Sequence, residues 1–196
     1  IDPACISFAG PGKRDDELEA AIAVGVTLNC ESEGEAARAF AIGERLGQRQ
    51  RIAIRVNPSF ELKGSGMKMG GGAKPFGVDA ERVPDLARHV IARGAEWRGL
   101  HIFTGSQTLS AEAIIEAQGN VLDLAAKLAD DIGRGLPKLN MGGGLGIPYF
   151  PGDEPVDLPK VGKALAERVA NLPPVLGETE LCLELGRYLV GEAGVY

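Results

Sequence analysis

The stretch Lys138-Leu-Asn-Met-Gly-Gly-Gly-Leu-Gly146 begins as a short β-type run and ends in a cluster of glycines. Five other short runs are followed in the same way by polar or glycine-rich residues, and most of the runs are apolar on both faces. Such runs are typical of parallel strands that helices cover on both sides. The predicted strands are Cys5–Ala9, Val26–Cys30, Ile52–Val56, Leu100–Phe103, Lys138–Met141 and Glu180–Leu185.

Helical patterns fill the gaps between these strands. Ser32 and Glu35 predict a capping box at the start of one helix, which Gly47 would end. Pro84 is expected to begin another helix. The remaining helices are expected from a cap at Asp15 to Gly25, from about Ser110 to Ile132, and from about Leu158 to Val169.

The order of strands and helices favours an α/β fold with a parallel sheet. Polar clusters at the carboxyl ends of parallel strands occur in open sheets and in (β/α)₈ TIM barrels, and six equivalent strands favour the barrel. A closed barrel needs eight strands and typically about 250 residues, whereas this chain has 196. We therefore expect a partial barrel of six βα units in one domain over residues 1–196, and we interpret the chain as a fragment.

Composition argues against several classes of function. The net charge is −6, with no basic stripe, which argues against nucleic acid and anionic membranes as partners. No apolar run approaches the ~18 residues of a membrane span. Three cysteines lie far apart in apolar runs, which indicates reduced thiols in a cytoplasmic protein. Only two histidines are present and neither neighbours a cysteine, so no metal site is expected.

Gly142, Gly143 and Gly144 give the strongest local signal for a ligand. Residues without a Cβ atom let backbone amides approach and wrap a phosphate. Neither the dinucleotide-binding motif nor the P-loop motif fits here. A tight turn is the alternative, although three adjacent glycines exceed what a turn requires.

Two charged positions also end predicted strands. Glu184 is followed at three residues by Arg187, beyond Gly186. A desolvated carboxylate needs a cationic partner. Glu184 and Arg187 could form a structural ion pair, or Glu184 could pair with a protonated ring nitrogen while Gly186 and Arg187 hold an anion. Arg55 is expected to face the carboxyl end of the barrel and to meet an anion or an aromatic ring.

Three further features have plain alternatives. Ser106 is placed to donate to a phosphate, but it could equally cap a helix. His101 lies inside an apolar strand, where a core histidine with satisfied hydrogen bonds is the usual outcome. The stretch Lys63–Lys74 contains five glycines and three lysines, so it is expected to be a poorly ordered loop or a lid over the site.

Together these motifs resemble the fold-type III, alanine-racemase-like barrels that use pyridoxal 5′-phosphate (PLP), specifically the ornithine and diaminopimelate decarboxylases. The Lys63–Lys74 stretch, with Phe8–Lys13, is most similar to a subgroup found with bacterial exosortase loci, where some relatives act on carrier-protein-tethered substrates. The segments that carry the resemblance are Phe8–Lys13, Glu31–Glu35, Arg55–Pro58, Phe76–Gly77, Gly99–His101, Gly105–Gln107, Gly142–Tyr149 and Glu184–Arg187.

The resemblance implies a role for each candidate residue. Glu184 would keep the pyridine nitrogen of PLP protonated and Arg55 would lie beside the ring, so these two are the catalytic candidates. Phe103 stands where the family has a histidine that stacks on the ring. The cofactor-binding candidates are Phe103, His101, Ser106, Gly142, Gly143, Gly144, Gly186 and Arg187.

Three residues besides Phe103 depart from the family pattern. Asn140 replaces an aspartate before the glycines, Leu185 replaces a proline, and Pro75 replaces a lysine. These changes bear on the substrate more than on the cofactor. The family's cofactor-binding lysine and second strand belong before Ile1, and its C-terminal β-domain belongs after Tyr196, so the fragment alone is expected to be inactive.

Three functions fit these residues. The first is PLP-dependent decarboxylation of an amino acid that resembles diaminopimelate or ornithine, or of one tethered to an acyl carrier protein, by an enzyme that is a homodimer at full length. The second is a phosphate-binding barrel isomerase or aldolase without PLP. The third is a non-catalytic decarboxylase relative that acts as a binding protein. A cofactor-binding lysine encoded upstream would favour the first.

Overall fold

The computed structural model describes residues 1–60, 62–64, 67–68 and 74–194. Its main sheet is parallel, and the path through this sheet follows the chain in the order β1-β2-β3-β6-β8-β9. This order is that of the six strand–helix units that the sequence predicts. The strands are β1 (Ser7–Phe8), β2 (Thr27–Cys30), β3 (Arg51–Asn57), β6 (Glu96–Ile102), β8 (Lys138–Asn140) and β9 (Glu180–Cys182).

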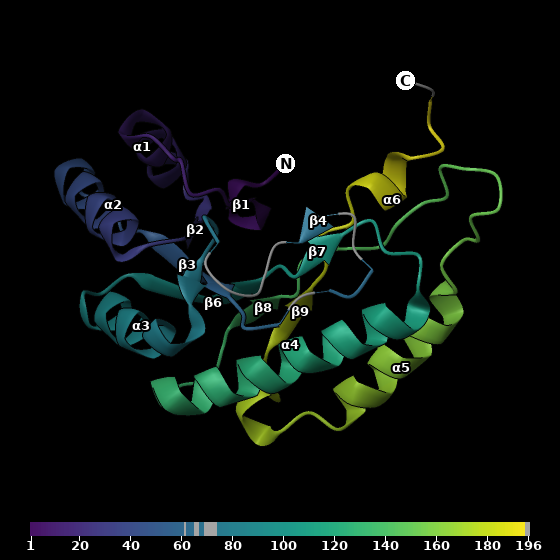
Figure 1. Cartoon of the computed structure of the whole chain (residues 1–196). Helices are drawn as coiled ribbons and strands as arrows, with labels where there is room; N and C mark the ends of the chain where they lie inside the picture. Colours follow the sequence, from purple (N-terminus) through teal and green to yellow (C-terminus); the bar gives the residue numbers. More distant parts are fainter. Residues whose placement is uncertain (61, 65–66, 69–73, 195–196) are drawn as a thin grey trace.

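The longer helices follow the strands and cover one side of the sheet, as Figure 1 shows, whereas the short helix near the C-terminus lies apart from them. The opposite side is called the inner face below. The α-helices are α1 (Asp15–Val24), α2 (Glu33–Leu46), α3 (Val83–Ala92), α4 (Ala111–Ile132), α5 (Leu158–Ala170) and α6 (Arg187–Val190), and the short 3₁₀ turns are Pro3–Cys5, Ala80–Arg82 and Pro174–Leu176.

Three short strands are not predicted by the sequence. β5 (Val78–Asp79) pairs with the end of β3. β4 (Met67–Lys68) pairs antiparallel with β7 (Gly105–Ser106) in a separate two-stranded sheet. Each has only two residues, too few for a period-2 pattern, so only the surrounding fold can reveal them.

The observed helix caps agree with only part of what the sequence predicts. Asp15 is the first residue of α1 and not its cap, because the Glu17 carboxylate reaches back to accept the backbone N–H of Arg14 at 2.8 Å. Ser32 caps α2 as expected, accepting from the Glu35 backbone at 3.1 Å. The second half of the predicted box is wrong, because the Glu35 carboxylate accepts from the Glu31 backbone instead, at 3.0 Å.

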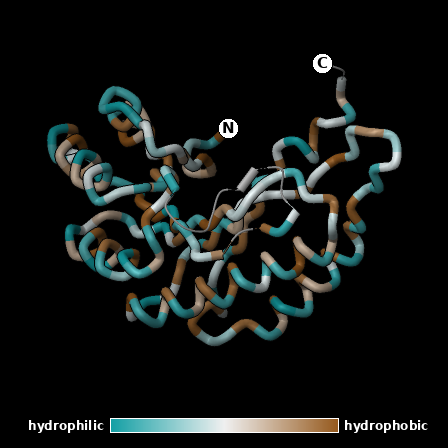
Figure 2. The backbone as a smooth tube through the Cα atoms, viewed as in Figure 1, coloured by the Kyte–Doolittle hydropathy of each residue, from teal (hydrophilic) through white to brown (hydrophobic). Residues whose placement is uncertain are grey.

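The core lies between the helices and the outer face of the sheet. Along β3, Ile52 and Ile54 belong to this core, whereas Ala53 borders a cavity on the inner face. This alternation is expected because successive side chains of a strand point to opposite faces. Figure 2 shows hydrophilic residues along the outer sides of the helices and hydrophobic residues toward the sheet. The cavity on the inner face is bordered by polar residues such as Asn29, Asn140 and Glu184 together with apolar ones such as Ala53 and Leu100.

Among the residues that the structure describes, no helix combines the length and the apolar character needed to cross a membrane.

Candidate functional site

A pocket of about 180 Å³ lies beyond the carboxyl ends of β6, β8 and β9. Three loops that are far apart in the sequence build it, and six of the residues expected from the sequence meet there. These six are Phe103, Ser106, Gly144, Glu184, Gly186 and Arg187, and the pocket is completed by Gln107, Leu145 and Leu185.

Two glycines allow these loops to approach each other. A Cβ atom at Gly143 would lie 2.1 Å from the carbonyl oxygen of Glu184. Gly144 has φ +113°, and its Cβ would lie 3.0 Å from the carbonyl oxygen of Gly105. Any side chain would therefore push the turn away from the neighbouring loops. The turn brings backbone amides to the pocket because it lacks side chains here.

The Arg187 guanidinium is held at the edge of this pocket. Its Nη1 donates to Gln107 Oε1 at 3.0 Å, and its carbon lies 5.7 Å from the ring centre of Tyr149. Gln107 has φ +59° and donates to the carbonyl of Ile147 at 2.6 Å. Sequence reasoning missed Gln107 as a support for Arg187, although it lies in one of the segments that carry the resemblance.

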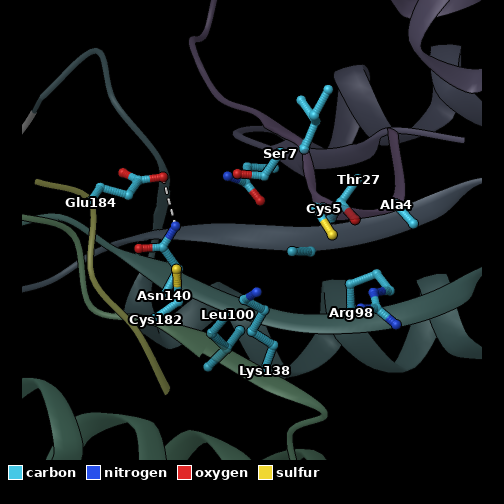
Figure 3. A pocket seen from close by; sticks show the side chains of 13 residues that line it. Ala4, Cys5, Ser7, Thr27, Arg98, Leu100, Lys138, Asn140, Cys182 and Glu184 are labelled. Atoms are coloured by element: carbon cyan, nitrogen blue, oxygen red, sulfur yellow. Dashed lines mark hydrogen bonds between the residues drawn. The ribbon is translucent and has the colours of Figure 1, made fainter. Parts of the chain in front are cut away.

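The Glu184 carboxylate contacts Asn140 and His101 rather than Arg187. Asn140 Nδ2 donates to Glu184 Oε1 at 2.7 Å, and His101 Nε2 lies 3.4 Å from Glu184 Oε2. Figure 3 shows the bond between Glu184 and Asn140 as a dashed line. The structural ion pair that the sequence left open is thus replaced by contacts with an amide and an imidazole.

His101 is buried behind Glu184, at 2% exposure, and does not border the 180 Å³ pocket. Its Nδ1 lies 3.2 Å from Nδ2 of Asn29. An amide nitrogen can only donate, so Nδ1 accepts and neutral His101 carries its proton on Nε2, toward Glu184. This contact is the main reason that the pKa of the Glu184 carboxyl is below its ordinary value, with smaller contributions from Asn140 and Arg55.

Arg55 meets both an anion and aromatic rings, as its place at a strand end predicts. Its Nη1 donates to Glu31 Oε1 at 3.0 Å. Its guanidinium carbon lies 5.0 Å from the ring centre of Phe76 and 5.9 Å from that of Phe103. The side chain is buried and lies behind Phe103, outside the residues that border the 180 Å³ pocket.

Two buried carboxylates, of Glu31 and Glu35, were not among the candidate site residues, and Glu35 was expected only as part of a helix cap. Glu31 also accepts the backbone N–H groups of Gly10 and Gly77, so it joins three loops. Glu35 lies 2.6 Å from the buried ammonium group of Lys13. A glutamate placed directly after an apolar strand is the signal that could have identified Glu31, because buried carboxylates require several donors.

A second cavity of about 210 Å³ lies on the inner face of the sheet. In Figure 3, Glu184 and Asn140 lie at one end of this view and Arg98 at the other. Glu184 borders both cavities. Its carboxylate therefore stands between the inner face and the pocket that Ser106 and Arg187 border.

The Lys63–Lys74 stretch reaches the same region. Met67 pairs with Ser106 and Lys68 with Gly105 through the backbone. The sequence predicts low order for this stretch, but residues 65–66 and 69–73, which make up much of it, lie outside the described residues. The predicted low order and the lid role both stay predictions.

Residues 1–191 match the family model described as "Pyridoxal-dependent decarboxylase, pyridoxal binding domain". The chain belongs to this family. This pyridoxal-binding domain is 32% identical over 196 residues to the L-glutamyl-[BtrI acyl-carrier protein] decarboxylase of Niallia circulans, covering 97% of the chain and 45% of the relative. It is 34% identical over 201 residues to the diaminopimelate decarboxylase of Methanothermobacter thermautotrophicus, covering 98% of the chain and 45% of that relative.

A solved structure confirms the partial barrel. The diaminopimelate decarboxylase of Helicobacter pylori, in complex with L-lysine, superposes on this pyridoxal-binding domain with a TM-score of 0.82 at 29% identity. The match covers 95% of this chain and 46% of the other. The chain thus spans about half the length of the relatives it matches. The exosortase-associated subgroup is not distinguished by these comparisons.

The pocket of the pyridoxal-binding domain fits PLP chemically. Its lining includes Ser106, the glycine turn and Arg187, whose hydroxyl, amide and guanidinium donors suit a phosphate dianion. Its lining also includes Glu184 and Phe103, whose carboxylate and ring suit a protonated heteroaromatic ring. A site with both features accommodates a group that is anionic at one end and aromatic at the other.

Proposed function

We propose that this chain forms the cofactor-binding part of a PLP-dependent amino-acid decarboxylase. The observation that carries the proposal is that Ser106, Gly144, Arg187, Glu184 and Phe103 all border one pocket. Of the three functions considered from the sequence, the family match favours this one. Bound PLP supplies an electron-withdrawing ring that stabilises the carbanion left when an amino acid loses CO₂.

The phosphate would be held by backbone amides and two side chains. In the turn over Gly142, Gly143 and Gly144, the N–H groups of Gly143 and Gly144 would face the phosphate because no side chain covers them, whereas the N–H of Gly142 donates to Asn140 Oδ1. Ser106 would add a hydroxyl donor. Arg187, beside Gly186, would add a charge-assisted bond, and its link to Gln107 fixes the guanidinium before any ligand arrives.

Glu184 would hold a proton at the pyridine nitrogen. The pKa of its carboxyl is below its ordinary value, mainly because of His101, so the carboxylate is ionised at neutral pH and acts only as an acceptor. A protonated ring nitrogen is the complementary donor. In this arrangement His101 serves the cofactor through Glu184 and not by direct contact.

Phe103 and Arg55 would form one wall of the ring site. Phe103 is half-buried at the pocket, and the Arg55 guanidinium lies 5.9 Å from its ring centre. A phenyl ring in place of the family's histidine stacks without offering a hydrogen bond. The charge of Arg55 is already paired with Glu31, so we assign Arg55 to shaping the wall and adding positive potential.

The substrate is proposed to be an amino acid of the diaminopimelate or ornithine type, or one tethered to an acyl carrier protein. The names of two similar relatives support these two options. We also propose a cytoplasmic homodimer. The free thiols of Cys5, Cys30 and Cys182 are consistent with a reducing compartment. The exposed Tyr149, Phe150, Leu189 and Val190 are consistent with a subunit interface near the pocket.

The test is release of CO₂ by the protein that carries this chain, with PLP added. Diaminopimelate, ornithine, arginine and a glutamyl-loaded acyl carrier protein are compared at equal concentration. Turnover of a free amino acid supports the first option, and turnover of the loaded carrier alone supports the second. No CO₂ from any of them, with PLP bound, would contradict the decarboxylase assignment.

A further inference from the structure

Asn140 is the last residue of β8 and uses both ends of one amide. Its Nδ2 donates to Glu184 Oε1 at 2.7 Å, and its Oδ1 accepts the backbone N–H of Gly142 at 2.9 Å. The side chain is 7% exposed. One buried amide therefore joins the first glycine of the phosphate turn to the carboxylate that faces the ring site.

We propose that Asn140 is a positioning residue that fixes Glu184 relative to the glycine turn and, together with His101, keeps the Glu184 carboxylate ionised. The proposal rests on the proposed function, because it concerns the same pocket. It adds a residue that neither touches the cofactor in that assignment nor belongs to the candidate set from the sequence.

An amide is needed at position 140 because a second carboxylate there would lie next to the Glu184 carboxylate. An aspartate at this position, which the family resemblance leads one to expect, could still accept from Gly142. Its other oxygen would then face Glu184 Oε1 at the distance of the present bond, 2.7 Å. Two carboxylates so close cannot both ionise, and one proton must be shared between them. Asn140 avoids this by offering a donor at that point.

The other groups around Glu184 do not replace this donor. His101, from β6, approaches the other carboxylate oxygen, Oε2, at 3.4 Å and not the Oε1 that Asn140 contacts. Arg55 acts from β3, but its guanidinium is bonded to Glu31. Cys182 on β9 is a thiol whose pKa is raised, chiefly by burial, so it stays neutral. Among the described residues, Asn140 makes the closest polar contact with the Glu184 carboxylate, at 2.7 Å against 3.4 Å for His101.

The fold around Asn140 does not depend on its side chain alone. The backbone N–H of Glu184 donates to the carbonyl of Gly142 at 2.8 Å, and Asn140 is aligned with His101 and Cys182 in the parallel ladder. Truncation of Asn140 therefore leaves the strand ends joined. Its effect is expected on the Glu184 carboxylate rather than on folding.

The test is a titration of the Glu184 carboxyl by carbon NMR in the full chain, labelled at glutamate side chains and assigned with Glu184→Gln. Asn140→Asp is expected to increase the proton affinity of Glu184 at least tenfold, about one pH unit. Asn140→Ala is expected to cause a smaller increase, and it also shifts the amide signal of Gly142, which Asn140→Asp retains. Asn171→Asp, at an exposed cap of α5, is the matched control and leaves the titration unchanged.

The outcomes separate the two proposals. An unchanged Glu184 titration in both Asn140 variants overturns the positioning role. If Asn140→Asp does not fold, judged by circular dichroism, Asn140→Ala alone decides, because a Glu184 titration equal to that of the native chain overturns the role. The titration needs no cofactor. If Glu184 responds as expected but PLP shows no binding in equilibrium dialysis, the positioning role stands and the cofactor assignment fails.

Discussion

Arg55 Nη1 donates a hydrogen bond to Glu31 Oε1 at 3.0 Å, and both side chains are buried. The same carboxylate accepts the backbone N–H groups of Gly10 and Gly77. The loops after β1 and β2, the end of β3 and the segment before β5 therefore meet at one carboxylate. Removing its charge affects all four at once.

Glu31→Gln is expected to destabilise the chain by about 3 kcal/mol. The variant leaves the Arg55 charge buried without a counter-ion, and the new NH₂ group faces a donor of Gly10 or Gly77. Urea unfolding followed by circular dichroism measures the change. Glu33→Gln is the matched control, because Glu33 forms an exposed pair with Arg82 that contributes less than about 1 kcal/mol. Equal losses in both variants would contradict the role given to Glu31.

The strands and helices could be predicted because their signals are local. The apolar run that contains Ile52 and Ile54 is enough to predict a buried strand. Gly47 likewise predicts the end of α2, where it adopts the left-handed conformation. The partners of polar groups could not be predicted in the same way. Glu35 pairs with Lys13 and Arg55 with Glu31, and those choices depend on which loops the barrel brings together.

The same distinction holds for the candidate site: where its residues gather could be predicted, but which polar groups they contact could not. The residues that border the pocket follow strands directly, so the carboxyl ends of the strands already predict where they gather. The contacts of Glu184 with Asn140 and His101 depend on the register of three neighbouring strands, β6, β8 and β9. Gln107 needs φ +59°, which is unusual for a residue other than glycine and follows from its bonds to Ile147.

The three thiols are expected to react in a fixed order. Cys5 is exposed, Cys182 is partly buried, and burial raises the pKa of the Cys30 thiol far above its ordinary value. Thiolate is the reactive form. With Ellman's reagent at pH 8, the native chain should show a fast phase from Cys5, a slow phase from Cys182 and a third equivalent only in denaturant. Cys5→Ser should remove the fast phase alone; a fast phase from Cys30 would contradict the buried position.

Gly143→Ala is expected to destabilise the chain by about 1–3 kcal/mol, because its Cβ would lie 2.1 Å from the carbonyl oxygen of Glu184 and the backbone must move. Gly162→Ala, in α5, is the control. No atom lies within 4 Å of the Cβ that alanine adds there, so it should be neutral or stabilising. The midpoints of thermal unfolding measure both effects. A neutral Gly143→Ala would show that the turn does not need its close approach.

The stability of the fold should depend on pH through Glu184. His101 is the main cause of a folded-state pKa below the ordinary value of 4.5. Because the pKa of Glu184 is lower in the folded chain than in the unfolded chain, its ionised form stabilises the fold. This stabilisation is fully present at pH values above the unfolded-state pKa and is lost as the pH falls through the folded-state pKa. The carboxylate is 44% exposed, so the contribution is small. Unfolding midpoints of the native chain and of Glu184→Gln should differ at pH 7 and converge on acidification; a constant difference would contradict the shift.

Arg187 and Glu184 are expected to affect different measurements, because they face different ends of the proposed cofactor. Arg187→Gln removes a charge-assisted donor, so PLP affinity of the chain in equilibrium dialysis should fall about 10- to 100-fold. Arg168→Gln, on the exposed side of α5, is the matched control and should not change it. Glu184→Gln leaves every phosphate contact in place but cannot hold a proton at the ring nitrogen. In the protein that carries this chain, it should therefore lower kcat strongly while PLP affinity changes little. A loss of PLP affinity in Glu184→Gln as large as in Arg187→Gln, with kcat of the PLP-saturated enzyme unchanged, would contradict the role given to Glu184.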